Sequence, residues 1–271
     1  MVKLEVHPHE MYMMVGEEIS RNPVSVCVSI VSHGHGAMVG RLVNALLYCP
    51  EVGQIILTLN VPESLAVPED ARITVVQNAI RKGFGANHNA AFKMCQEGFF
   101  CVLNPDIEFL ADPFPLLIEA LESGKAAVSA PLVVSPTGSV EDSIRYFPRP
   151  SRLLLKLLFG DEGRYATEPG QENFSPEWCA GMFLLFRSHD FGCLGGFDEG
   201  YFLYYEDVDI CVRVWQQGMR VVVCPKISVV HDARRDSRRS LKHLRWHLAS
   251  MLRFFSQHWG SLPSVPDSRK N

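Results

Sequence analysis

The stretch YFLYYEDVDICVRVWQQG, residues 201–218, places three acids between a run of aromatic residues and an apolar pattern with helical spacing. The apolar residues recur at i, i+3, i+4 and i+7, so the stretch predicts a helix that begins near Glu206 and is closed by Gly218. Acids in a first helical turn complement the helix dipole, which is one interpretation of Glu206, Asp207 and Asp209. The other is chemical: Asp207 lies at the mouth of this helix, where it could act as a general base.

Segments with strand character flank this helix and recur toward the N-terminus. Residues 179–187 (CAGMFLLFR) and 219–225 (MRVVVCP) read as buried strands on either side of it. Further strands are expected at residues 24–31, 54–60, 72–78 and 99–104, the last of which stops at Pro105. Helices are expected at residues 37–49, 87–98 and 113–121, and the last of these leads into AAVSAPLVV. Strands that alternate with helices predict an α/β fold with a mostly parallel central sheet and helices on both faces. No linker rich in Pro, Gly or Ser divides the chain, so both halves are expected to share one continuous sheet within one domain.

Polar residues stand where several of the predicted strands end. They are Ser32, His33, Asn60, Asn78 and the segment 104–106. Ligands of parallel sheets bind beyond the carboxyl ends of the strands, although polar residues also end strands without further purpose. Asp106 follows Pro105 in a turn, where its carboxylate could hold a hard divalent cation shared with substrate phosphates. The alternative is that NPD forms only an Asx-type turn.

Two other segments leave alternatives open. RKGFGANHNAAF, residues 81–92, combines a glycine turn, two basic residues and a helix start, an arrangement that can face a nucleotide or phosphate. It fits neither the P-loop pattern nor the dinucleotide fingerprint, and a plain loop explains it equally well. His231 follows a strand-like run, and a structural or surface role competes there with a metal or phosphate role.

Composition limits the classes of protein to consider. The 271 residues are 47% hydrophobic and carry a formal net charge of -4, so neither disorder nor nucleic-acid binding is expected. The eight cysteines are scattered, without CxxC or metal-ligand spacing, which favours reduced thiols and a cytoplasmic location. The first residues lack the apolar core of a signal peptide, and no apolar run approaches the roughly 20 residues that span a bilayer.

Taken together, the segments resemble the inverting glycosyltransferases of family 2. The resemblance rests on NPD after a strand, on CAGMFLLFRSHDFGCLGGFDEGYFLYYEDVDICVRVWQQG (residues 179–218) and on a histidine after the next strand, and it covers residues 24–231. Within the family the chain looks most similar to the rhamnosyltransferase-like branch of bacterial polysaccharide assembly. The resemblance implies a GT-A fold over residues 23–232, with a Rossmann-like nucleotide-binding half to about residue 112 and an acceptor-binding half after it. It also implies a nucleotide-sugar donor and a divalent cation, Mg²⁺ or Mn²⁺.

The same resemblance implies roles for single residues. Asp207 matches the catalytic base, while Asp106 and His231 match the metal-binding acid and the C-terminal histidine that helps to hold metal or diphosphate. The residues on the nucleotide-sugar side are Ser32, His33, Asn60, Arg81, Gly83, Asn89, Asn104 and Asp106. The residues on the acceptor side are Trp178, Gly181, Asp198, Glu199 and Glu206, the last of which caps or orients.

The chain departs from the family pattern on the donor side. Asn104 stands where many relatives carry the first acid of an Asp-x-Asp motif, although NPD is common in the rhamnosyltransferase-like branch. LTLN, residues 57–60, stands where Val-Asp-Asn is usual, so Asn60 would replace the acid that reads the base or ribose. Arg81 precedes KGFG where relatives often have Asn-x-Gly-Phe. The identity of the nucleotide therefore stays open.

The function that the resemblance implies is transfer of a sugar with inversion to a glycan acceptor, often lipid-linked, in bacterial cell-surface polysaccharide synthesis. L-rhamnose from dTDP-rhamnose is the candidate donor group. Two alternatives remain. A catalytically degenerate scaffold that binds glycan or membrane would explain the donor-side departures. A nucleotidyltransferase would usually show a basic glycine-rich loop after the first strand, and SHGHGAMVG carries no Lys or Arg before Arg41.

The C-terminal segment, residues 233–271, predicts one basic amphipathic helix from Arg234 to Trp259, followed by a tail. Its apolar side comprises Leu241, Leu244, Leu248, Leu252, Phe255 and Trp259, and its basic side comprises Arg234, Arg235, Arg238, Lys242 and Arg245. Such a helix suits the surface of an anionic membrane, here the inner face of the plasma membrane. Alternatively it packs its apolar side on the catalytic core and leaves the basic side in solvent. Residues 1–22 are expected to form an N-terminal extension.

Overall fold

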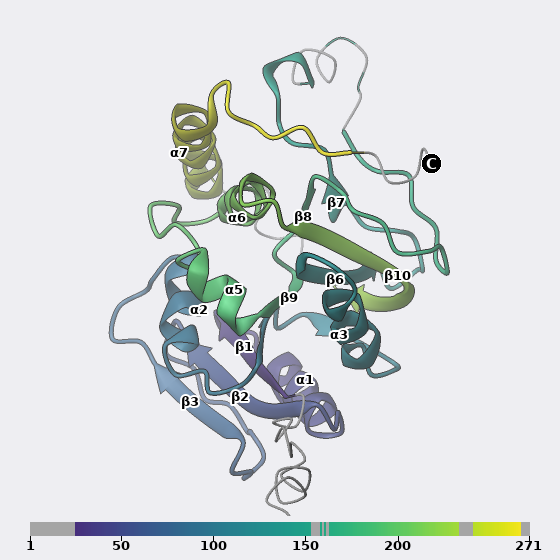
Figure 1. Ribbon diagram of the computed structural model, residues 1–271. Helices are drawn as coiled ribbons and strands as arrows, with labels where there is room; N and C mark the ends of the chain where they lie inside the picture. The colour runs from purple at the N-terminus through teal and green to yellow at the C-terminus, as the bar shows by residue number, and fades with distance from the viewer. Residues whose placement is uncertain (1–24, 153–157, 159, 161–162, 233–240, 267–271) are drawn as a thin grey trace, which may run out of the picture.

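The computed structural model describes residues 25–152, 158, 160, 163–232 and 241–266 (Figure 1). The predicted extension at residues 1–22 and the arginines at residues 233–240 of the predicted C-terminal helix therefore lie outside the described residues. The strands are β1 (Val26–Ser32), β2 (Val52–Leu59), β3 (Ile73–Gln77), β4 (Phe99–Leu103), β5 (Ile107–Glu108), β6 (Ala126–Val134), β7 (Ile144–Arg145), β8 (Trp178–Cys179), β9 (Phe183–Arg187) and β10 (Arg220–His231). The helices are α1 (Ala37–Leu47), α2 (Phe84–Phe92), α3 (Phe114–Glu122), α5 (Ser188–Cys193), α6 (Glu206–Gln216) and α7 (Leu241–His258).

An eight-stranded sheet runs through both halves of the chain in the order β3-β2-β1-β4-β9-β6-β10-β5. The first four strands pair in parallel, as do β6 and β10. Strand β9 joins the halves, because it pairs antiparallel with β4 on one side and with β6 on the other. The predicted α/β fold with a continuous, mostly parallel sheet is confirmed.

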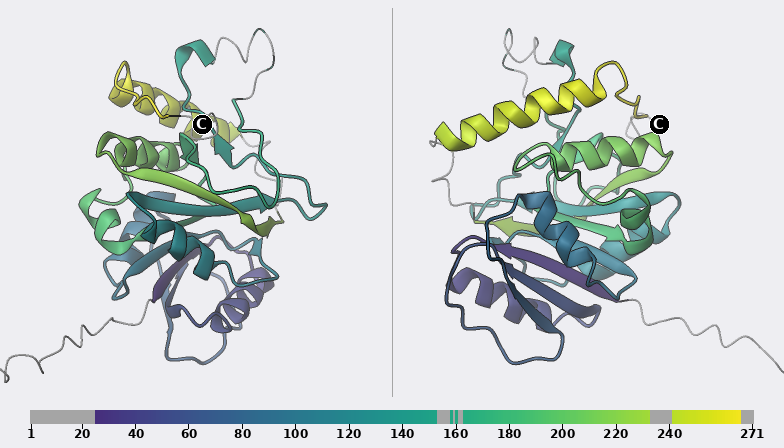
Figure 2. Two further views of the ribbon diagram at one scale, coloured as in Figure 1. Left: turned by 45° about the vertical axis from the view of Figure 1, so that its right-hand side comes forward. Right: turned by 90° about the vertical axis from the view of Figure 1, so that its left-hand side faces the viewer.

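Helices cover both faces of this sheet, as a largely parallel sheet requires. Alternate residues of a strand point to opposite faces, so β1 sends Val26, Val28 and Ile30 into one core and Cys27 into the other. The first core is closed by α1 and α3, and the second by α2, α5, α6 and α7. Figure 2 shows α7 as an outer layer that lies beyond α6.

Two predicted elements differ from the observed ones. The helix expected at residues 87–98 begins at Phe84 and ends at Phe92, well before Gly98, because the chain must turn there to enter β4 at Phe99. The strand expected at residues 179–187 is two strands. Cys179 pairs with Ile144 in a separate two-stranded sheet, whereas Phe183 pairs with Leu103 in the main sheet, and the break between them falls at Gly181.

Helix α7 docks through a face that the apolar pattern did not indicate. Its buried residues are Ser250, Phe254 and His258, whereas Leu241, Leu244, Leu248, Leu252 and Trp259 are 44–80% exposed. Hydrogen bonds explain this choice of face: Ser250 Oγ donates to the Leu203 carbonyl (2.9 Å), and His258 Nε2 lies 2.7 Å from Asp209 Oδ1. The leucines of the predicted apolar side therefore face away from the core, whereas Phe255 of the same side packs partly against it.

All eight cysteines are free, as their scattered positions suggested. Within the described ranges, no helix is both long and apolar enough to cross a bilayer.

Candidate active site

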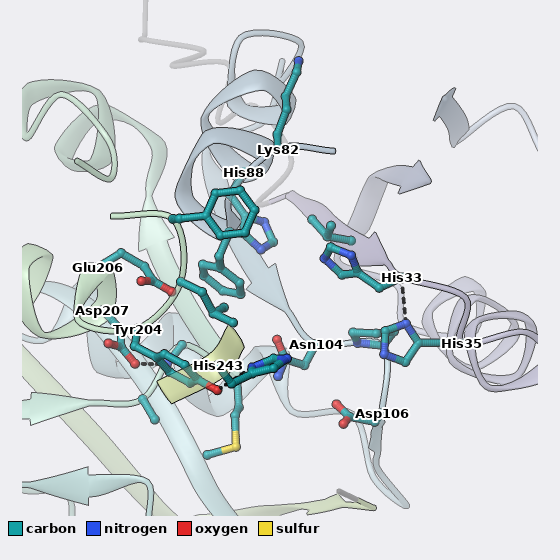
Figure 3. Close-up of a pocket in the computed structure, with 18 of the residues that line it drawn as sticks. His33, His35, Lys82, His88, Asn104, Asp106, Tyr204, Glu206, Asp207 and His243 are labelled. Carbon is teal, nitrogen blue, oxygen red and sulfur yellow. Dashed lines mark hydrogen bonds between the residues drawn. The ribbon is translucent and has the colours of Figure 1, made fainter. Parts of the chain in front are cut away.

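A cavity of about 570 Å³ opens where β1 and β4 end and where α2 and α6 begin (Figure 3). Seven of the residues singled out from the sequence line it: His33, Arg81, Asn104, Asp106, Gly181, Glu206 and Asp207. Both halves of the chain thus contribute to the cavity, because the ends of β1 and β4 and the start of α2 line it together with the start of α6. A strand-end cavity of this size suits a ligand as large as a nucleotide.

The start of α6 is a strained corner. Tyr204 and Tyr205 have φ values of 73° and 70°, in the left-handed region that residues with side chains rarely adopt. Such strain persists where the surrounding structure enforces it, often at functional sites. Here it turns the chain so that Glu206 and Asp207 enter the helix facing the cavity (Figure 3).

The Asp207 carboxylate is held in place by backbone donors. Its Oδ2 accepts a hydrogen bond from the Gly181 N–H (3.0 Å), and its Oδ1 accepts one from the Val208 N–H (2.9 Å). Burial raises the pKa of Asp207 above its ordinary value, and these two N–H groups oppose the rise. A fixed carboxylate of raised pKa in a cavity wall is suited to accept a proton.

Glu206 differs from its neighbour in burial. Its side chain is only 4% exposed, and its Oε2 has no hydrogen-bond partner among the described residues. Burial, and then the charge on Asp207, raise the pKa of Glu206 well above its usual range. Of two adjacent carboxyls, the more deeply buried one holds the proton. Burial therefore favours the shared proton on Glu206, while the two backbone N–H donors favour the charged form of Asp207.

On the other side of the cavity the structure brings together Asp106 and His231, which are distant in sequence. His231 Nε2 lies 3.3 Å from Asp106 Oδ2, and His231 Nδ1 lies 3.4 Å from Glu141 Oε2. These carboxylates raise the pKa of His231 against the effect of burial. Sequence reasoning missed Glu141, because nothing local in the loop before β7 signals its contact with the end of β10.

Asp106 retains one carboxylate oxygen for a ligand. Its Oδ1 is buried and has no hydrogen-bond partner within the described ranges, although Asp106 lines the cavity. The described residues contain no group of three or more His, Cys, Asp or Glu side chains that could hold an ion by themselves. Asp106, which lines the cavity, could hold a divalent cation together with His231, which lies next to Asp106 but is not among the cavity-lining residues.

The donor side of the cavity carries positive charge. Arg81 and Lys82 line it, and the Arg81 guanidinium lies over the rings of Phe202 (5.9 Å) and Trp246 (5.3 Å). Burial, and then the charge of Arg81, lower the pKa of His33 to about 4, so His33 is neutral at neutral pH. Arg81 and Lys82 are thus the basic residues of this part of the wall, and Figure 3 shows the Lys82 side chain extending away from Asp106 and Asp207.

Three residues predicted on the nucleotide-sugar side, Asn60, Gly83 and Ser32, are not part of the cavity wall. Asn60 accepts from the Lys82 N–H (2.9 Å) and donates to the Lys82 carbonyl (2.8 Å), so its buried amide holds the basic turn. A Cβ on Gly83 would lie 2.7 Å from the Phe202 carbonyl oxygen, so only glycine allows this approach. Ser32 is buried at the end of β1 and lies 3.4 Å from His35 Nδ1.

Several predicted acceptor residues have partners within the fold and are absent from the cavity wall. Asp198 accepts hydrogen bonds from Arg253 (2.8 Å) and Gln257 (2.9 Å) of α7. Asn89, predicted on the donor side, donates to Glu199 (3.1 Å) and to the Phe197 carbonyl (2.8 Å). Trp178 Nε1 donates to the Tyr146 carbonyl (3.0 Å).

Other cavity residues were not singled out from the sequence. They include His35, Phe84, His88 and His243, whereas Phe202 and Tyr204 belong to the aromatic run at residues 201–205 and Lys82 is one of the two basic residues of the segment 81–92. Lys82, Phe84 and His88 belong to the segment 81–92, whose glycine turn was the signal. His243 comes from α7 and hydrogen-bonds to the Tyr204 hydroxyl (3.0 Å), a contact that no local pattern predicts.

Comparison with known proteins supplies the family. Residues 57–187 match the family described as Glycosyl transferase family 2. The chain is 32% identical to rhamnosyltransferase WbbL of Escherichia coli K12 over 247 residues, which cover 86% of this chain and 93% of that one. It is 33% identical over 165 residues to N-acetylglucosaminyl-diphospho-decaprenol L-rhamnosyltransferase of Mycobacterium tuberculosis, covering 57% of this chain and 54% of the relative.

Solved structures show the same fold at low sequence identity. GalNAc-T7, solved with UDP, GalNAc and Mn²⁺, superposes with a TM-score of 0.62 at 16% identity, covering 78% of this chain and 44% of that one. The mannosyltransferase PcManGT of Pyrobaculum calidifontis, solved with GDP-Man and Mn²⁺, gives 0.55 at 14% identity, covering 84% and 64%. The long match to WbbL, the family match and the shared architecture agree with the resemblance that the motifs carried. The chain belongs to glycosyltransferase family 2 and has the GT-A fold.

Proposed function

We propose that this glycosyltransferase moves a sugar with inversion from a nucleotide-sugar to a glycan acceptor, with Asp207 as the general base. One observation carries the proposal: the Asp207 carboxylate, fixed by the Gly181 N–H, shares a cavity with Asp106 and two basic residues. Inversion needs a single displacement, in which a base and a site for the leaving group lie on different sides of the sugar. Asp207 on α6 and Asp106 after β4 supply these two sides.

In this reaction Asp207 takes the proton of an acceptor hydroxyl while that oxygen forms a bond to the anomeric carbon. The bond from the anomeric carbon to the diphosphate oxygen breaks, and the nucleoside diphosphate leaves with the electron pair. Arg81 and Lys82 lie where they can face the developing charge. Burial raises the pKa of Glu206, and a protonated Glu206 would add no second negative charge beside Asp207 to repel the donor phosphates.

A divalent cation, Mg²⁺ or Mn²⁺, fits the other side of the site. Asp106 and His231 would hold it, and Glu141 orients the His231 ring from the far side. When bound, the cation supplies positive charge that stabilises the diphosphate leaving group.

For the donor we propose dTDP-rhamnose, and for the acceptor a lipid-linked glycan of a bacterial cell-surface polysaccharide. Support comes from the names of two relatives, a rhamnosyltransferase and a decaprenol-linked L-rhamnosyltransferase. Position 60 carries an asparagine instead of an acid, and the Asn60 side-chain amide is already hydrogen-bonded to the backbone of Lys82. Recognition of the base therefore falls to the cavity residues themselves.

A donor screen tests this proposal. UDP, dTDP and GDP are titrated calorimetrically with and without Mg²⁺ or Mn²⁺, followed by a transfer assay with the matching sugar. We expect cation-dependent binding of dTDP and a product of inverted anomeric configuration by NMR. Preference for another nucleotide would refute the dTDP-rhamnose assignment. Absence of binding by all three would refute catalysis and favour a scaffold that only binds glycan or membrane.

We further propose that α7 rests on the cytoplasmic face of an anionic membrane. Leu241, Leu244, Leu248, Leu252 and Trp259 form an exposed apolar row, which we call the leucine row. Lys242 and Arg245 are exposed on the same helix, and the sequence adds four arginines at residues 233–240. Apolar residues beside cations match an anionic lipid surface. The same helix brings His243 to the cavity, so a lipid-linked acceptor would be near the site.

The double substitution Leu248→Ser, Leu252→Ser tests this contact. We expect at least a tenfold loss of binding to phosphatidylglycerol-containing vesicles, since each buried leucine contributes roughly 1.5–3 kcal/mol. Co-sedimentation measures the loss, and vesicles of phosphatidylcholine alone should bind the wild type less well. The matched control is Leu110→Ser, Leu116→Ser, which changes two exposed leucines outside α7. Unchanged vesicle binding, with a dimer converted to a monomer, would identify a second copy as the partner instead.

A further inference from the structure

His88 occupies the middle of α2 and the wall of the active-site cavity, and none of the roles described above involves it. Its side chain is 1% exposed, and its Nδ1 lies 2.8 Å from Ser29 Oγ of β1. Its Nε2 is buried and has no hydrogen-bond partner among the described residues. In the view of Figure 3, His88 lies between the labelled His33 and Glu206. A buried polar atom without a partner is costly, so its position beside a ligand cavity calls for an explanation.

The contact with Ser29 determines what Nε2 offers. Ser29 is fully buried on β1, and the ring nitrogen of His88 is the one hydrogen-bond partner found for its hydroxyl in the described residues. If Nδ1 carried the proton, the Ser29 hydroxyl hydrogen would be left without an acceptor. If the hydroxyl donates to Nδ1, both groups are satisfied and the ring proton resides on Nε2. The second arrangement makes Nε2–H a donor that finds no acceptor in the described part of the chain.

The surroundings indicate an uncharged acceptor. Burial lowers the pKa of His88 to about 3, so the ring is neutral at neutral pH. The ring packs edge-on against Phe84 (4.5 Å between ring centroids) and lies near Phe197 (6.2 Å). Charged phosphates have Arg81 and Lys82 within the same cavity, whereas this pocket of aromatic carbon with one neutral donor suits a neutral oxygen.

We propose that His88 Nε2–H donates a hydrogen bond to an uncharged oxygen of the nucleotide-sugar donor, either a hydroxyl or a carbonyl of the base. Ser29 is a positioning residue that acts through His88 by fixing its tautomer. The inference rests on the proposed function, because it takes the nucleotide-sugar as the ligand of this cavity. It adds a specificity-determining contact on α2 to the acidic and basic residues already described.

The test compares His88→Phe, which keeps an aromatic ring without a donor, with His88→Gln, whose amide can still donate toward the cavity. The probes are the nucleoside diphosphate that binds the wild type and the corresponding nucleotide-sugar. We expect His88→Phe to weaken binding of at least one probe about tenfold. A loss of this size is typical when a neutral hydrogen bond to a ligand is removed and the ligand oxygen is left desolvated without a partner. His88→Gln should recover part of this loss. The matched control is His189→Phe, an exposed histidine of α5 outside the cavity.

The two probes locate the oxygen. Weaker binding of the nucleoside diphosphate places it in the nucleotide, whereas a loss confined to the nucleotide-sugar, seen as a higher KM, places it in the sugar. If His88→Phe does not fold, as judged by its melting curve, His88→Gln and Ser29→Ala carry the test through their donor affinities. If the variants bind both probes with wild-type affinity, this inference is overturned but the proposed function is not. Failure of the wild type to bind any nucleotide would overturn the proposed function, and this inference with it.

Discussion

Asp207→Asn should reduce the rate of sugar transfer by roughly 10²–10⁴-fold, the usual contribution of a positioned general base. Asparagine keeps the shape of the side chain and can still accept the Gly181 N–H through its amide oxygen, but it cannot take a proton. The effect should therefore fall on kcat, with little change in the affinity for the nucleoside diphosphate. Steady-state kinetics of transfer together with calorimetry of nucleotide binding measure the two quantities separately.

The pH profile provides a second readout for the same residue. Burial raises the pKa of Asp207, so the base is lost by protonation as the pH falls through that raised value. The wild-type kcat should accordingly decline on the acid side at a higher pH than an exposed carboxyl would give. The matched control is Glu122→Gln, which neutralises an exposed acid at the end of α3 without touching the cavity. Near-normal kcat in Asp207→Asn would assign the base to another residue.

Asp106→Asn should lower transfer by about 10²–10³-fold, the effect of removing one electrostatic stabiliser from a reaction centre. Its unpartnered Oδ1 is the oxygen that we assign to the cation, and an amide oxygen carries no compensating charge. Unlike Asp207→Asn, this variant should also lose the part of nucleotide affinity that depends on Mg²⁺ or Mn²⁺. Calorimetry with and without the cation measures that loss.

The same substitution has a structural control. Asp106 also lies against His231, so its replacement could loosen the end of β10. Glu141→Gln changes the other carboxylate beside His231 but leaves Asp106 Oδ1 in place. We expect Glu141→Gln to retain more of the cation-dependent nucleotide affinity than Asp106→Asn does. If both variants lose it equally, or if Asp106→Asn binds the nucleotide with undiminished cation dependence, Asp106 is not the principal metal ligand.

Periodicity and local spacing determined much of the framework. The i, i+3, i+4, i+7 pattern placed α6 almost to the residue, and with it Asp207 at the helix mouth. Runs of β-branched and apolar residues located β1, β2, β4 and β10, and thus the cavity at the strand ends. These features were predictable because each depends on residues that are neighbours along the chain. The break of the predicted strand at Gly181 was not, since it depends on pairing with two different sheets.

Contacts between distant segments were decided only in the tertiary structure. The pairing of His231 with Asp106 and Glu141, and the contact of Asp198 with α7, join residues from separate elements. The same is true of His88, whose proton position depends on a hydroxyl of β1.

Helix α7 shows the physical reason. The sequence determined that this helix has an apolar and a basic side, but not which side would meet the core. Hydrogen bonds from Ser250, Arg253 and His258 to the α5–α6 connection and α6 bind the opposite face, and this leaves the leucine row exposed. Amphipathicity is a property of one segment, whereas the face that a helix buries depends on the surface it meets.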